Sequence, residues 1–153
     1  MITIADVLTP HQLNLNLKAT TSADAILEVC ELLKSDDRVT DWLKFYGSLK
    51  STNACVSDEQ GAAVCIPHAR TDSVHSMVMA AGRSVQGIED PLNKVRIHWI
   101  FVIGVPVALA SDYLRIIGAL ARIFRSSAVE MKLRNATSKS EFMQLLQEQE
   151  LRA

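Results

Sequence analysis

The stretch Trp99–Val105, which reads WIFVIGV, is apolar throughout and rich in β-branched and aromatic residues. Two shorter stretches, Ala62–Ile66 and Met77–Ala81, have the same apolar character. A continuous apolar run is typical of a strand covered on both faces, as in a mostly parallel sheet between helices. These stretches therefore predict the central strands of an α/β domain. The polar residues 83–96, between Met77–Ala81 and Trp99–Val105, include a glycine and a proline, and we expect them to form turns.

Helical patterns precede and follow these strands in the sequence. Ser138–Glu141 is a capping box that predicts a last helix, and Thr21–Asp24 is a similar helix start. Ser111 or Asp112 can begin a helix that reaches Arg125. Three further elements follow from apolar spacing: a helical turn within residues 1–10, a short strand at 13–17, and a helix at 37–49 with Val39, Trp42, Leu43 and Tyr46 facing inward. The predicted architecture is a three-layer α/β domain with a mixed, mostly parallel sheet flanked by helices on both faces.

Length and composition indicate one globular domain over residues 1–153, because 48% of the residues are apolar and 22% are charged. Sixteen basic and seventeen acidic residues leave a net charge of −1, which argues against a dedicated nucleic-acid binder. The longest apolar run, 97–110, contains His98 and Pro106 and is too short to cross a bilayer. No signal peptide is visible, so we expect a cytoplasmic protein without membrane insertion.

The three cysteines, Cys30, Cys55 and Cys65, form no C-x-x-C pair. We expect reduced thiols, as in other cytosolic proteins. Cys65 lies within a predicted buried strand, so packing is the favoured interpretation over a thiol–imidazole pair with His68.

The segment 62–72, AAVCIPHARTD, carries the best candidate for chemistry. Pro67 has no N–H group, so we expect the chain to leave the sheet there and to place His68 just past a strand end. A neutral imidazole is a competent nucleophile toward phosphorus, and Arg70 can pair with a phosphoryl group on the ring. Ser51 and Thr52 can donate hydroxyl hydrogen bonds to the same oxygens. The spacing alone leaves a second interpretation open, in which His68 is simply a turn histidine.

The other candidate residues are expected to be structural. His98 opens an apolar strand and is predicted to be a satisfied core or edge histidine, while His11 and His75 are expected to face solvent. Histidines this scattered predict no metal site. Arg115, Arg122 and Arg125 share a helix face, which is either an ordinary solvated face or a docking surface for an acidic partner.

The sequence IPHARTD at 66–72 resembles the active-site signature of enzyme IIA domains of the phosphoenolpyruvate:sugar phosphotransferase system, in the fructose/mannitol/nitrogen-regulatory class. Other blocks resemble this family in the same order: Ile4–Pro10, the Ser51-Thr52 pair, Phe101–Pro106, Tyr113–Phe124 and Leu133–Ser138.

The resemblance implies a phosphohistidine carrier with the mannitol/fructose-like enzyme IIA fold. The family's phosphorylated histidine falls on His68. Such a domain accepts the phosphoryl group from phospho-HPr or a paralogue and passes it to an enzyme IIB, or signals a target protein by its phosphorylation state. The chemistry requires no metal or organic cofactor. We expect Arg70, Ser51, Thr52 and Tyr113 to support the phosphoryl group.

Two departures from the family pattern bear on this expectation. Tyr113 stands where many members have a second histidine. Tyr46 and Gly47 stand where many have an Arg-Glu pair, for which Lys50 is a candidate substitute. The departures favour a regulatory role over sugar uptake, although the sequence does not separate the two. They also leave an alternative function, an interaction module that keeps the fold and is not phosphorylated.

Overall fold

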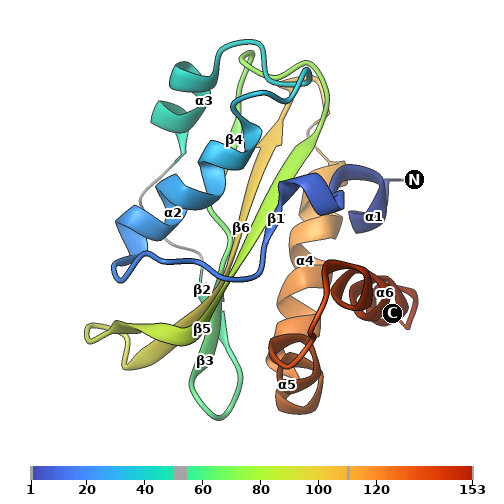
Figure 1. The fold of residues 1–153 in the computed structure, drawn as a ribbon. Helices are drawn as coiled ribbons and strands as arrows, with labels where there is room; N and C mark the ends of the chain where they lie inside the picture. The colour runs from blue at the N-terminus through green and yellow to red at the C-terminus, as the bar shows by residue number, and fades with distance from the viewer. Residues whose placement is uncertain (1, 50–54, 110, 153) are drawn as a thin grey trace.

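The computed structural model describes residues 2–49, 55–109 and 111–152. Within these ranges six strands form one mixed sheet in the order β1-β5-β6-β3-β2, and β4 also pairs with β6 (Figure 1). The β1·β5, β3·β6 and β4·β6 pairs are parallel, whereas the β5·β6 and β2·β3 pairs are antiparallel. The strands are β1 Leu13–Asn14, β2 Cys55–Ser57, β3 Ala62–Cys65, β4 His68–Arg70, β5 Val78–Asp90 and β6 Val95–Val105.

Helices cover both faces of the sheet, which confirms the predicted three-layer architecture (Figure 1). One face is covered by α1 Ile4–Val7, α4 Asp112–Arg125, α5 Ser127–Arg134 and α6 Lys139–Leu151. The other face is covered by α2 Ser22–Cys30, the 3₁₀ helix η2 Glu31–Leu33 and α3 Trp42–Ser48. A second 3₁₀ helix, η1 Pro10–Gln12, precedes β1. In the described part of the chain, no helix is long and apolar enough to cross a membrane.

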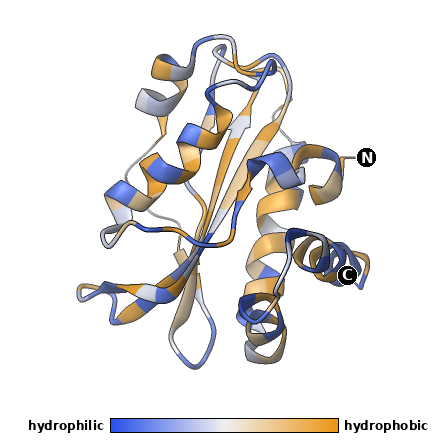
Figure 2. Cartoon of the chain, in the orientation of Figure 1, coloured by the Kyte–Doolittle hydropathy of each residue, from blue (hydrophilic) through white to orange (hydrophobic). Residues whose placement is uncertain are grey.

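The alternation of side chains along β6 builds both halves of the core. Trp99, Phe101 and Ile103 point toward the α4–α6 layer, where Trp99 packs against Phe124 and Phe142. Ile100 and Val102 point toward the α2–α3 layer. This strand is therefore apolar at successive positions because both of its faces are covered, as the sequence predicts. In Figure 2 the hydrophobic colour follows the central strands, and hydrophilic colour lies on the outer sides of the helices.

The prediction of turns over residues 83–96 is wrong, because most of these residues extend β5 and β6. Ile88 pairs with Ile97, and the turn itself is confined to Pro91–Lys94. The resulting hairpin extends outward from the rest of the sheet (Figure 1), so most of its residues from 85 to 96 are exposed although its backbone is paired, while Ile88 is buried. Gly87 has a φ of 82° within the irregular part of the β5·β6 register, a conformation that glycine adopts at little cost.

Arg83 lies inside the protein at the base of this hairpin and is 6% exposed. Its Nε donates to the carbonyl oxygen of Leu15 at 3.0 Å. Its Nη1 donates to the carbonyl oxygens of Leu133 and Ala136 at 3.1 and 2.8 Å. One side chain thus joins the residue after β1 to the C-terminal end of α5, where helix carbonyls lack partners within the helix.

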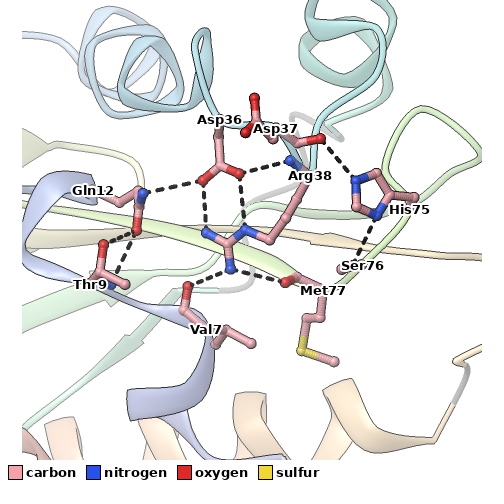
Figure 3. A network of polar contacts seen from close by, with 9 residues as sticks. All are labelled: Val7, Thr9, Gln12, Asp36, Asp37, Arg38, His75, Ser76 and Met77. Carbon is pink, nitrogen blue, oxygen red and sulfur yellow. Dashed lines mark hydrogen bonds and ion pairs between the residues drawn. The ribbon is translucent and has the colours of Figure 1, made fainter.

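The predicted helix at 37–49 begins later than expected, at Trp42. Residues 36–40 are held in a non-helical conformation by a polar network around Arg38 (Figure 3). The Arg38 guanidinium donates to both carboxylate oxygens of Asp36 and to the carbonyl oxygens of Val7 and Met77. Backbone hydrogen bonds also join residues 38 and 40 to 75 and 73.

The inward face of α3 also differs from the prediction. Leu43 is 76% exposed, and the fully buried residue is Phe45. Asp41 caps the helix by accepting a hydrogen bond from the Lys44 backbone N–H, and this start fixes which side chains face the sheet. Trp42 and Tyr46 are half-buried and stack on each other with ring centroids 5.4 Å apart.

Two of the cysteines form a disulfide, contrary to the expectation of reduced thiols. Cys55 of β2 lies directly opposite Cys65 of β3, and their sulfur atoms are bonded. Their sequence separation of 10 residues gave no sign of this pairing, because it depends on the register of the hairpin. Cys30 is a free thiol buried in α2, and burial raises its pKa to about 12.

Candidate functional site: a histidine at the end of a buried strand

His68 is the first residue of β4 rather than part of a turn, which corrects the expectation drawn from Pro67. The backbone passes through Pro67 and resumes parallel pairing with β6, where His68 is in register with Ile103. The Ile103 N–H donates to the Pro67 carbonyl oxygen at 3.0 Å, so Pro67 still takes part in the sheet as an acceptor. His68 therefore has a backbone position fixed by the sheet, with a half-buried side chain.

One backbone contact sets the state of the His68 ring. Nδ1 lies 2.8 Å from the carbonyl oxygen of Ile66. A carbonyl oxygen can only accept a hydrogen bond, so in the neutral ring Nδ1 carries the proton and Nε2 carries the lone pair. Nε2 makes no hydrogen bond to any residue that the structure describes. The arrangement leaves Nε2 as a nucleophilic nitrogen whose direction is fixed by the sheet.

Tyr113, from the start of α4, lies beside this ring. The ring centroids of His68 and Tyr113 are 5.9 Å apart with an interplanar angle of 37°. Tyr113 follows the first residue of a 14-residue helix, so the free N–H groups of the first turn of α4 lie on this side of the sheet. A helix start is electropositive and favours a negatively charged group nearby.

Arg70 lies two residues beyond His68 on the same strand, and therefore on the same face of the sheet. Its side chain is exposed, and Nη2 donates to the carbonyl oxygen of Val107 at 3.0 Å. Val107 follows the end of β6, so this contact joins the two chain segments beyond the strand ends. Among the residues that the structure describes, Arg70 forms no ion pair with a carboxylate, which leaves its charge available to an anion.

The end of the motif is tied to α3. Lys44 Nζ lies 2.6 Å from Asp72 Oδ1, and both side chains are more than half exposed. The hydrogen bond to Lys44 lowers the pKa of Asp72, and the reciprocal contact raises the pKa of Lys44. Asp72, the acidic residue of the motif, therefore has its ion-pair partner on α3.

The structure brings three of the five predicted site residues to one place: His68, Arg70 and Tyr113. Ser51 and Thr52, together with Lys50, lie outside the described residues. The carbonyl groups of Ile66 and Val107, which accept hydrogen bonds from His68 and Arg70, were not predicted as part of this site. No side-chain pattern could reveal them, because backbone acceptors are supplied by any residue type.

His98 is buried, and His11 and His75 are exposed, as predicted. His98 is 4% exposed, and its Nδ1 donates to the Ser84 carbonyl oxygen at 2.7 Å. Arg115, Arg122 and Arg125 are exposed on α4, and Arg115 donates to the Ile2 carbonyl oxygen. Cys65 faces the α2–α3 layer, away from His68, and its sulfur is already bonded. Within residues 2–49, 55–109 and 111–152, no three metal-ligating side chains are grouped.

Comparison with known proteins identifies the family of this chain. The profile described as "Phosphoenolpyruvate-dependent sugar phosphotransferase system, EIIA 2" matches residues 6–149. The chain belongs to the EIIA 2 family. This is the family that the sequence around His68 resembles, and the chain is therefore a phosphotransferase-system component.

Individual EIIA proteins cover nearly the whole chain. It is 31% identical over 149 residues to the fructose-specific EIIA component of Haloferax volcanii, covering 96% of this chain and 97% of that protein. The nitrogen regulatory protein IIA-Ntr from Neisseria meningitidis has a similar structure, with a TM-score of 0.80, 20% identity and coverage of 94% and 98%. Enzyme IIA-mannitol of Escherichia coli, in its complex with phosphorylated enzyme IIB-mannitol, gives a TM-score of 0.70 at 16% identity, with coverage of 92% and 97%.

Proposed function

We propose that this EIIA 2 protein is a phosphohistidine carrier that accepts a phosphoryl group on Nε2 of His68. The observation that supports this most directly is the contact between His68 Nδ1 and the Ile66 carbonyl oxygen at 2.8 Å. It leaves the other ring nitrogen, Nε2, unprotonated before any partner arrives. A nucleophile that is already in the reactive tautomer requires no proton transfer before attack.

The proposed step moves one phosphoryl group between two imidazole rings. The Nε2 lone pair attacks the phosphorus of the donor phosphohistidine, so the Nε2–P bond forms as the donor N–P bond breaks. Positive charge develops on the His68 ring during this step. The Ile66 carbonyl oxygen, which accepts a hydrogen bond from Nδ1–H, stabilises that charge without removing the proton.

The neighbouring side chains have roles in the same proposal. Arg70 binds the phosphoryl oxygens with the N–H groups not used by Val107, and the planar guanidinium suits this geometry. Tyr113 donates its hydroxyl to a phosphoryl oxygen from the start of α4. Ser51 and Thr52 are further hydroxyl donors that precede β2 in the sequence. The chemistry uses no metal or organic cofactor.

Partners follow from the same chemistry. We infer that phospho-HPr or a paralogue is the donor and that an enzyme IIB is the acceptor, as the solved enzyme IIA–enzyme IIB complex of the mannitol system suggests. The fructose-specific component at 31% identity supports a role in sugar uptake over the regulatory role favoured by the departures at Tyr113 and Tyr46.

Phosphorylation from labelled phosphoenolpyruvate tests the proposal. The protein is incubated with enzyme I, HPr and [³²P]phosphoenolpyruvate, and the label is tested for acid and base stability. We expect acid-labile, base-stable label on the wild type and none on His68→Ala. His11→Ala is the matched control, because it removes an exposed histidine outside the site and should be labelled like the wild type.

The same experiment separates the proposal from its alternatives. Label on both the wild type and His68→Ala would identify a different nucleophile. No label on either protein, with several HPr paralogues tried, would favour the interaction module that keeps the fold without accepting phosphate. Binding of an enzyme IIB to both proteins would then be measured directly.

A further inference from the structure

We propose that Cys55 and Cys65 form a redox-active cysteine pair whose oxidation state controls phosphoryl acceptance by His68. The inference rests on the proposed function of His68 and adds a modification site to it. The two residues are directly opposite in the antiparallel β2·β3 pair, with Cα atoms 4.1 Å apart and sulfur atoms bonded. Because the hairpin itself brings the side chains together, the bond can form and break without a change of register.

The pair can be reached from solvent through Cys55. In the described part of the sheet β2 is an edge strand, and Cys55 is half-buried, whereas Cys65 is 1% exposed. Cys55 also lines a cavity of about 250 Å³ together with Val56, Ser57, Ala63, Asn93 and Val95. Thiol chemistry with a small molecule therefore begins at Cys55. Cys30, by contrast, is fully buried, and its raised pKa keeps it a thiol.

The oxidant that fits this access is a low-molecular-weight disulfide of the glutathione type. The Cys55 thiolate attacks one sulfur of that disulfide, which forms a mixed disulfide and releases one thiol. The Cys65 thiolate then attacks Cys55 Sγ and displaces the second thiol, which closes the internal bond. The two cysteines lose two electrons and two protons, and the small disulfide is reduced to two thiols. A dithiol reductant reverses the reaction.

The connection to His68 runs through the backbone. Cys65 faces the α2–α3 layer, while His68 contacts Tyr113 on the opposite face, so the sulfur does not touch the ring. The residue after Cys65 is Ile66, whose carbonyl holds His68 Nδ1. The disulfide joins this segment covalently to the edge strand, and reduction leaves only the β-pairing of β2 with β3. The disulfide adds a covalent restraint to the sheet pairing that already positions Ile66 and His68, so we expect the oxidised form to restrict the direction of the Nε2 lone pair further and to accept the phosphoryl group faster.

Thiol counting establishes whether the pair is reversible. Protein treated with oxidised glutathione, or with dithiothreitol and then freed of it, is denatured and alkylated, and the labels are counted by mass spectrometry. We expect one label on the oxidised protein, at Cys30, and three on the reduced protein. In Cys30→Ala the counts should be zero and two. A pair that stays reduced with oxidised glutathione, or that resists dithiothreitol in the folded protein, overturns the proposal.

The rate of phosphorylation by phospho-HPr measures the coupling. We expect the oxidised wild type to be phosphorylated about fivefold faster or more than the reduced wild type. Cys30→Ala should retain this difference, and Cys55→Ser should show one slow rate under both treatments. Equal rates for the oxidised and reduced wild type overturn the proposal even if the disulfide forms.

A second readout keeps this proposal separate from the function on which it rests. The imidazole ¹⁵N shifts of His68 report which ring nitrogen carries the proton, without any donor. Oxidised protein should show the Nδ1–H form, and reduction should shift the resonances toward a mixture. If neither form accepts phosphate, the proposed function of His68 fails, and the ¹⁵N spectra then decide whether the pair controls the ring. Identical spectra in that case overturn the coupling as well.

Discussion

A backbone carbonyl oxygen selects the tautomer of the His68 ring. His68 would have two interchangeable tautomers in water, but the contact with Ile66 selects the one with a free Nε2. Arg70 donates to the Val107 carbonyl, which keeps its guanidinium beside the strand end while most of its N–H groups remain free. Both side chains are thus oriented by backbone groups, and neither orientation depends on an ionised partner.

Removal of the Arg70 guanidinium should slow both directions of phosphoryl transfer. We expect Arg70→Ala to accept and discharge the phosphoryl group about tenfold more slowly or worse, because a charged donor to the transferring oxygens is lost. Arg70→Lys should recover part of the rate, since it keeps the charge without the planar fork. Rapid-quench measurement of both reactions provides the test, with Arg122→Ala, exposed on α4, as the control. Unchanged Arg70→Ala rates would remove Arg70 from the site.

The buried His98 makes stability depend on pH. Burial lowers its pKa below the ordinary value of 6.5, although the hydrogen bond to Ser84 opposes this shift. As the pH falls below 6.5, the unfolded chain therefore binds a proton at this residue that the folded protein does not, and the free energy of unfolding decreases.

Urea denaturation between about pH 7.5 and pH 5.5 measures this loss. His98→Gln keeps a donor for Ser84 but does not titrate, so its free energy of unfolding should change less over this interval. Equal changes in the two proteins would assign the pH dependence to other groups.

His68, Arg70 and Tyr113 could be chosen because their side chains carry chemistry and their motif resembles a known family. The contacts that orient them could not be chosen, because the carbonyl oxygens of Ile66 and Val107 are chemically the same as every other carbonyl in the chain. Their roles arise only when the strand ends meet.

Among the secondary-structure elements, those with strong local signals were predicted well. The long helix α4 runs from Asp112 to Arg125, as its apolar spacing indicates, and α6 begins directly after Ser138, the first residue of the predicted capping box. Elements whose bounds depend on contacts with distant parts of the chain were not predicted well. The start of α3 depends on Asp36 and Arg38, which are held by the N-terminal segment, and the polar β5·β6 hairpin is stabilised by its pairing. No element was predicted over Ser127–Arg134, where the chain forms α5.

Two glycine substitutions, in elements that both lie near the site, should change the free energy of unfolding in opposite directions. A Cβ at Gly104 in β6 would lie 2.7 Å from Phe45 and 2.9 Å from Val78, so Gly104→Ala should destabilise the protein by about 1–3 kcal/mol. A Cβ at Gly118 in α4 meets no atom within 4 Å, so Gly118→Ala should stabilise it by about 0.5–1 kcal/mol.

Chemical denaturation of both variants and the wild type checks this pair. A destabilised Gly118→Ala would mean that the exposed face of α4 is covered by something other than solvent. A neutral Gly104→Ala would mean that α3 can move away from the sheet without loss.

The molecule as a whole is held together by links between segments far apart in the sequence. Arg38 joins α1 to the start of β5, and Arg83 joins the chain after β1 to the end of α5. The three-layer arrangement was predictable because each layer has its own apolar pattern. These polar links were not predictable, because a single arginine in a sequence gives no indication of which distant carbonyls it will meet.

The Cys55–Cys65 disulfide should raise the stability of the whole domain. A covalent link across a sequence separation of 10 residues reduces the freedom of the unfolded chain, by about 2–3 kcal/mol for a loop of this size. We expect the oxidised protein to unfold at a higher denaturant concentration than the reduced protein, and Cys55→Ser to behave like the reduced protein under both conditions. Coincident unfolding curves for the oxidised and reduced wild type would show that the disulfide destabilises the native state as much as it destabilises the unfolded state.

The position of Arg83 has a consequence for how the protein is made. A ribosome synthesises Arg83 well before Leu133 and Ala136, whose carbonyl oxygens it requires. Until those residues emerge, the Arg83 guanidinium, which is buried in the folded protein, lacks most of its hydrogen-bond acceptors. The nascent chain must therefore keep it in contact with water. We therefore expect the half-synthesised chain to stay open to proteases and to close in one late step, when the C-terminal helices leave the ribosome and supply the missing acceptors.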